Sequence, residues 1–163
     1  MAATTRANRI HLAGDFRHEE AKANAALSPG HLLEIVNVSG DVEVRKHNQA
    51  GGTAERLFAM ENSLEGLRPG EAAGYGVTAD TAYAAGDLVM CGIFQRGAVV
   101  SALLKAGTNY TVATELISAG DGTLQKDTDS STIVRKDVIG VVLEPLDLSA
   151  SGATAKRGVV RLL

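Results

Sequence analysis

The sequence has little of several residue types, and each shortage excludes a class of protein. Its 163 residues include one cysteine, Cys91, so neither an internal disulfide framework nor a cysteine-rich zinc site can form. It has no tryptophan and 4% aromatic residues, so side chains on which bases or sugars could stack are scarce. No apolar run reaches about 18 residues, which argues against a transmembrane helix. The first nine residues lack the apolar segment of a signal peptide, so we expect synthesis and retention in a cytoplasm-like compartment or in an assembly built there.

What is present is typical of a soluble globular domain. Hydrophobic residues make up 45% of the chain and charged residues 21%, which is enough apolar surface to offset the loss of chain entropy on folding. The formal net charge of -3 disfavours wholesale electrostatic binding of nucleic acid. We therefore expect one domain, with or without an arm, that binds neither nucleic acid nor a membrane.

Residues 1–27 differ from the rest of the chain. They are rich in alanine and charge and have few large apolar side chains. Good helix formers fill residues 16–26, Asp15 is a plausible N-cap, and Glu19 and Glu20 fall in the first turns. We interpret 1–27 as an N-terminal arm that can contain a short helix and needs a partner surface; a frayed terminus is the alternative.

From residue 28 onward, short β-rich runs alternate with turn signals every 8–12 residues. Runs at 31–38 and 42–47 flank Ser39 and Gly40, which predicts a hairpin. For residues 54–61, periodicity does not decide between helix and strand. We predict a mostly β fold, a small β-barrel or β-sandwich domain over 28–163, with a long loop excursion near 62–82.

No motif points to catalysis or to a cofactor. The chain has no nucleophile elbow, phosphate loop or dinucleotide fingerprint. An enzyme would remain possible only if acids such as Glu34, Glu61 and Asp87 converged in a cleft. We therefore expect no enzymatic activity, no catalytic residues and no cofactor.

Two acidic groups contain residue types that can bind a metal. His18 with Glu19 and Glu20 could bind a metal adventitiously, but a solvated helix terminus is the simpler interpretation. Asp127 and Asp129 have calcium-loop spacing but lack the central glycine and the closing glutamate. We expect no metal site, and we expect Cys91, which lies in an apolar run, to be a small buried side chain.

Six segments, taken in order, resemble the capsid cement, or head decoration, proteins of tailed bacteriophages. The resemblance extends from about Arg6 to Leu163. The segments are NRIHLAGDF at 8–16, LSPGHLLE at 27–34, GGTAERLFAMEN at 51–62, YAAGDLV at 83–89, SAGDGTL at 118–124 and IGVVLE at 139–144.

The resemblance implies a non-enzymatic virion protein, made in the host bacterial cytoplasm and placed on the outer surface of the expanded capsid. Such proteins commonly sit at capsomer junctions, often as trimers, and brace the shell. The implied partners are the major capsid protein and other copies of the chain, as a homotrimer; a monomer that assembles on the shell is equally compatible with the residues.

The capsid-facing element that the resemblance implies is the N-terminal arm. Deleting residues 2–16 is expected to leave a folded domain that no longer binds. The competing interpretation is a β-rich ligand- or carbohydrate-binding module on a phage or cell surface. The candidate capsid-contact residues are Arg6, Asn8, Arg9, Ile10, Leu12 and Phe16.

Overall fold

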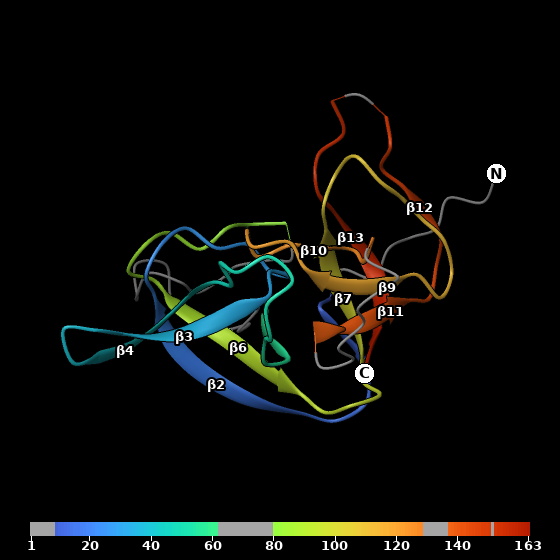
Figure 1. The fold of residues 1–163 in the computed structure, drawn as a ribbon. Helices are drawn as coiled ribbons and strands as arrows, with labels where there is room; N and C mark the ends of the chain where they lie inside the picture. The colour runs from blue at the N-terminus through green and yellow to red at the C-terminus, as the bar shows by residue number, and fades with distance from the viewer. Residues whose placement is uncertain (1–8, 62–79, 129–136, 151) are drawn as a thin grey trace.

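Short strands joined by tight turns run through the whole described chain (Figure 1). The structure is a computed structural model and describes residues 9–61, 80–128, 137–150 and 152–163. Within these residues it contains two larger sheets and a two-stranded ribbon. The mostly β fold class predicted from the sequence is confirmed.

Five strands close into a barrel. The barrel order is β7-β10-β9-β11-β13, and the ring closes because β13 also pairs with β7, from Lys156 opposite Leu104 to Arg161 opposite Val99. β13 takes one edge of β7, so β1 and β10 share the other. The six strands of this sheet are β1 (His11–Ala13), β7 (Val99–Leu104), β9 (Glu115–Ser118), β10 (Leu124–Lys126), β11 (Gly140–Val142) and β13 (Lys156–Leu162).

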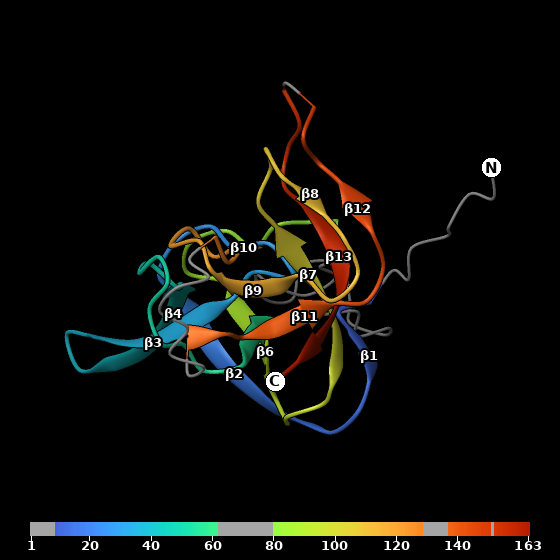
Figure 2. The ribbon, with the colours of Figure 1, turned by 45° about the vertical axis from the view of Figure 1, so that its right-hand side comes forward.

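The second sheet has the order β3-β4-β2-β6-β5, so β3 and β5 are its end strands. An antiparallel bridge between Leu32, just before β3, and Phe58 of β5 brings these two ends together. The ribbon of β8 and β12 stands at one end of the barrel (Figure 2). The strands of the second sheet are β2 (Phe16–Ala23), β3 (Leu33–Val38), β4 (Asp41–Lys46), β5 (Leu57–Ala59) and β6 (Leu88–Phe94), and those of the ribbon are β8 (Asn109–Tyr110) and β12 (Leu146–Asp147).

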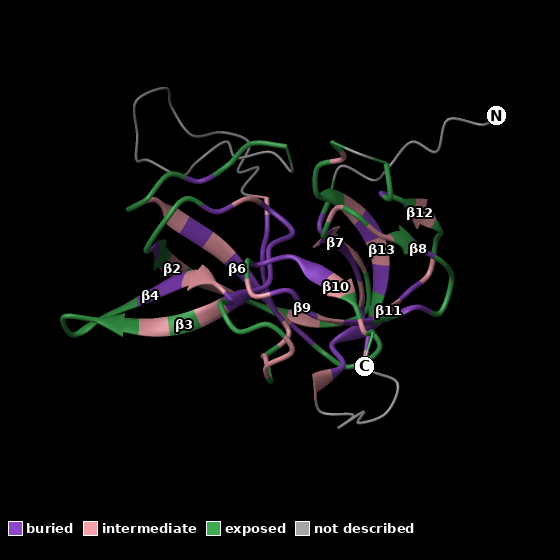
Figure 3. Cartoon of the chain, turned by 45° about the horizontal axis from the view of Figure 1, so that its top comes forward, coloured by how far each residue is buried: buried purple, intermediate pink, exposed green. Residues whose placement is uncertain are grey.

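The two sheets share a core because β5 and β6 are buried on both faces. Phe58 and Phe94 face the barrel and join its apolar cluster, together with Leu32. The alternate residues of the same strands, such as Leu57 and Cys91, belong to a second cluster on the other face of the sheet. Figure 3 shows this buried zone between the two sheets.

The short helix expected within residues 16–26 is wrong. Phe16–Ala23 forms β2, which pairs antiparallel with β6 along its length and parallel with β4 at its end. Helix propensity is a weak preference, and backbone pairing to two neighbouring strands outweighs it. β1 belongs to the barrel sheet and β2 to the second sheet, so the described part of residues 1–27 contributes a strand to each. Within 54–61, where the sequence left helix and strand open, β5 is a strand; of the expected loop excursion at 62–82, residues 62–79 lie outside the described residues.

Candidate functional site

The structure describes four of the six expected capsid-contact residues. Arg6 and Asn8 lie outside the described residues. Arg9 is exposed, and Leu12 and Phe16 are half-buried. These three remain available to a partner.

Ile10 is a core residue rather than an exposed contact. Its side chain is 0% exposed and belongs to the barrel cluster. Its amide donates to Glu61 Oε2 at 2.9 Å, and its carbonyl accepts from the amide of Ser101 at 2.8 Å. Deleting residues 2–16 would therefore remove a buried side chain and all of β1, so the truncated domain is expected to lose stability as well as any contact.

Phe16 belongs to a partly exposed group of rings, which we call the aromatic patch: His11, Phe16, His18 and Phe94. The Phe16 ring centroid lies 4.3 Å from that of His11, 4.5 Å from that of His18 and 5.2 Å from that of Phe94, against which it stacks. Pairing of β2 with β6 places Phe16 opposite Phe94. Half-exposed rings held in this way can contribute contact area at low entropic cost.

The hairpin of β3 and β4 carries most of the exposed large apolar side chains of the described chain. Ile35, Val38 and Val42 are 49%, 37% and 61% exposed, and the fourth such residue, Val112, is 58% exposed. The hairpin projects away from the barrel (Figure 1). The sequence predicted the hairpin but not its projection; the hint was that apolar residues occupy both faces of the two strands.

The hairpin is well ordered by its own turn and by ion pairs. Ser39 and Gly40 have φ values of 55° and 97°, which match a two-residue type I′ turn. Arg45 Nε donates to Glu34 Oε1 at 2.6 Å across the strands. A preformed hairpin loses little conformational entropy when a partner binds to it.

Glu43 fastens the hairpin to β2. Its buried carboxylate accepts a hydrogen bond from Asn24 Nδ2 at 2.8 Å and lies 3.3 Å from Lys22 Nζ. The hydrogen bond from Asn24 is the main cause that lowers the pKa of Glu43, and Lys22 adds to it. The sequence offers no sign of this pairing, because parallel contact between β2 and β4 is a tertiary feature.

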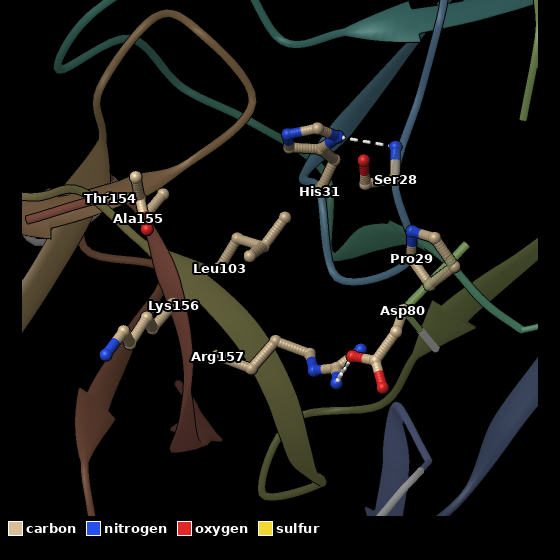
Figure 4. Close-up of a pocket in the computed structure, with 9 residues that line it drawn as sticks. All are labelled: Ser28, Pro29, His31, Asp80, Leu103, Thr154, Ala155, Lys156 and Arg157. Atoms are coloured by element: carbon tan, nitrogen blue, oxygen red, sulfur yellow. Dashed lines mark hydrogen bonds and ion pairs between the residues drawn. The ribbon is translucent and has the colours of Figure 1, made fainter. Parts of the chain in front are cut away.

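A cleft of about 580 Å³ opens between the turn at residues 28–31 and the start of β13 (Figure 4). Arg157 Nη2 on β13 binds Asp80 Oδ1 at 2.5 Å on one side. The ring of His31 lies on another side. The sequence could not predict the cleft, because its wall comes from four separate segments. The lining residues are Ser28, Pro29, His31, Asp80, Leu103, Thr154, Ala155, Lys156 and Arg157.

His31 is held as a neutral imidazole. The amide of Ser28 donates to its Nδ1 at 2.8 Å, so the ring proton lies on Nε2. The ring is 8% exposed, and burial, helped by the charge of Lys46, lowers its pKa to about 4. The ring therefore fixes the turn and offers one N–H donor at the edge of the cleft.

The acids considered for an enzyme each have a separate local partner. Glu34 pairs with Arg45 on the hairpin, whereas Glu61 accepts from the amide of Ile10. Asp87 accepts from the amide of Ala84 at 2.7 Å. Burial raises the pKa of Tyr83, and the charges of Glu61 and Asp87 add to that effect.

Of the acidic groups that could bind a metal, the structure describes His18, Glu19, Glu20 and Asp127. His18 and Glu19 are neighbours on β2 and point to opposite faces of the sheet. No group of three histidine, cysteine or acidic residues suited to a metal occurs in the described part of the chain. Asp129 lies outside the described residues.

Cys91 is buried, as predicted, and burial raises the pKa of its thiol to about 12. Among the residues that the structure describes, no helix is long and apolar enough to cross a membrane.

Comparison with known proteins gives a likeness at the level of the fold. No protein-family model matches the chain, and no curated protein matches its sequence. Among solved structures, the head fiber gp8.5 N base of bacteriophage phi29 is similar, with a TM-score of 0.52 and 17% sequence identity. The match covers 91% of this chain and 95% of that chain. The similarity therefore spans nearly the whole architecture of both molecules.

Proposed function

We propose that this chain is a non-enzymatic structural protein of a phage virion. In this proposal it binds the outer surface of the expanded capsid, contacts the major capsid protein and its own copies at capsomer junctions, and stabilises the shell. It acts without a cofactor, nucleic acid or a membrane. A homotrimer is the assembly implied by the sequence resemblance.

The observation that carries the proposal is the fold likeness to the base of a phage head fiber over 91% of the chain. The ordered sequence segments that resemble head decoration proteins also favour a virion protein. One source is a backbone arrangement and the other a set of sequence segments.

The hairpin and the aromatic patch supply surfaces suited to such a role. Ile35 and Val42 are exposed apolar side chains on a rigid projection, and Phe16 is a half-exposed ring. Burying exposed apolar area stabilises contact by about 25 cal/mol per Å² before the costs of association. Repetition over a symmetric shell lets each individual contact remain weak.

The test is co-sedimentation of the purified protein with expanded phage heads that lack it, with bound copies counted per head. Saturation at a simple multiple of the icosahedral sites is the expected result. A folded protein that does not co-sediment at any concentration contradicts the proposal.

Two substitutions locate the contact on the hairpin. Ile35→Thr and Val42→Thr remove exposed apolar surface while keeping a β-branched side chain, and are expected to weaken head binding. Val112→Thr is the matched control, because Val112 is similarly exposed but lies outside the hairpin. Equal binding by all three variants would show that the contact lies outside the hairpin.

A deletion shorter than 2–16 tests whether the N-terminal arm contacts the capsid. Removing residues 2–8 leaves Ile10 and β1 in place, so the barrel is expected to stay folded. Loss of head binding by this variant would support the arm as a capsid contact, and unchanged binding would exclude it.

The cleft favours a second candidate function, a ligand-binding module. Its volume of about 580 Å³ falls within the range of small-molecule sites. Two results together would support this alternative. The protein binds a small ligand saturably and loses that binding in Arg157→Gln, and it does not bind phage heads.

A further inference from the structure

One edge of the second sheet carries backbone hydrogen-bonding groups that the described chain leaves open. β3 is the outermost strand on that side, with β4 as its neighbour in the sheet. Val38 and Asp41 flank the two-residue turn, so they form a hydrogen-bonded pair of the hairpin. Alternation along the ladder makes Val36 and Glu43 the next such pair. The amide and carbonyl groups of Ile35 and Asn37 therefore point outward.

The open stretch of this edge is short. Residues 53–55 stand beside the first residues of β3, with a hollow of about 220 Å³ between them. No backbone hydrogen bond joins Ile35 or Asn37 to a residue beyond the hairpin in the described ranges. The segment that can accept another strand thus runs from about Ile35 to the turn.

The side chains of this segment are apolar as well. Val38 is 37% exposed and shares its face of the hairpin with Val36, while Ile35 and Val42 share the opposite face. Natural edge strands are usually protected by a charge, a proline or a bulge. Residues 35–38 have none of these.

We propose that residues 36–38 of β3 pair, antiparallel, with the same residues of a second copy of this chain. An occupant of this edge must provide an open strand edge and apolar side chains, and the hairpin of another copy provides both. A twofold arrangement centred on Asn37 places Val36 of each copy opposite Val38 of the other. The two sheets then form one continuous sheet.

This contact rests on the proposed function only in that copies of the chain meet on the shell; because it is twofold, it lies between trimers and not within one. It can be measured on the purified full chain without phage heads. The two proposals can therefore fail separately. Sedimentation is followed from about 10 μM to about 1 mM, together with amide hydrogen exchange at both ends of that range.

The exchange pattern is the discriminating result. The amide of Asn37 is expected to exchange fast at low protein concentration and to become protected as dimers form. Amides of Val36 and Val38 bond within the hairpin and are expected to be protected at both concentrations. Other contacts between copies would not give this alternation.

Val38→Lys tests the edge without breaking the hairpin, because the new ammonium lies opposite Asp41 on the same face. It is expected to raise the dissociation constant at least about tenfold, since a twofold contact contains the substitution twice. Val112→Lys is the control of equal charge and is expected to leave association unchanged. Unchanged melting temperatures verify that both variants are folded.

Three results would overturn the proposal. The first is a protein that remains monomeric at about 1 mM. The second is association with no added protection at Asn37. The third is a loss of association in Val112→Lys as large as in Val38→Lys.

Discussion

Lowering the pH from 7 to 4.5 is expected to destabilise the protein through His31. In the folded chain the pKa of this ring falls from 6.5 to about 4, because the ring is buried. Between these two values the unfolded chain binds a proton that the folded chain does not. The contribution of His31 to stability is therefore complete above pH 6.5 and is lost progressively as the pH falls toward 4.

The size of the effect follows from the two pKa values. Each pKa unit corresponds to about 1.4 kcal/mol, so the full difference is worth about 3 kcal/mol. Of this, about 2 kcal/mol is lost between pH 7 and pH 4.5. For a domain of this length, such a loss lowers the melting temperature by about 4–8 °C.

His31→Asn isolates this contribution. The asparagine side-chain oxygen can replace Nδ1 as the acceptor for the Ser28 amide, but it does not titrate. Urea unfolding at pH 7, 6, 5 and 4.5 is expected to show a free energy of unfolding that falls with pH in the natural protein and falls less in the variant. His18→Asn, at an exposed position of β2, is the control and is expected to behave like the natural protein. Parallel curves for the natural protein and His31→Asn would refute the assignment of His31 as a neutral buried ring.

Three further predictions concern packing. Gly14→Ala is expected to cost more than Gly97→Ala in denaturant unfolding, because both glycines have φ +89° but only at Gly14 would a Cβ meet a neighbour, Ala98 Cα at 2.7 Å; equal losses would contradict the close approach. Tyr83→Phe is expected to lower the free energy of unfolding by about 1–3 kcal/mol, because its buried hydroxyl donates to a backbone carbonyl at 2.7 Å. The Cys91 thiol is expected to resist a thiol reagent in the folded protein and to react after denaturation, since it is buried with a raised pKa; fast labelling of the native protein would show that β6 opens readily.

Local sequence predicted those elements whose partners lie close by in the chain. The β3–β4 hairpin is an example, because its turn at Ser39 and Gly40 and both of its strands lie within residues 33–46. β2 is the opposite example. Its residues favour a helix when considered alone, and its strand form depends on β6, about 70 residues further along.

Distant strands also decide how exposed the predicted contact residues are. In the sequence, Ile10 is an isolated apolar residue of an arm. In the structure its backbone forms hydrogen bonds with Ser101 and Glu61, which are distant in sequence, and its side chain lies in the core. Phe16 remains partly exposed, and the rings around it come from both β2 and β6. Exposure is a property of the assembled sheets and cannot be assigned from one segment.

By itself the sequence determined the β class, the positions of several turns and the burial of Cys91, because strand propensity, glycine conformation and apolar runs are local properties. Only the tertiary structure decided that five strands close into a barrel, that His31 stays neutral beside a cleft, and that apolar side chains of the β3–β4 hairpin remain exposed. These features depend on which distant strands pair and what they cover. Which strands pair depends on the packing energy of the complete core, and this energy cannot be assigned to any single segment.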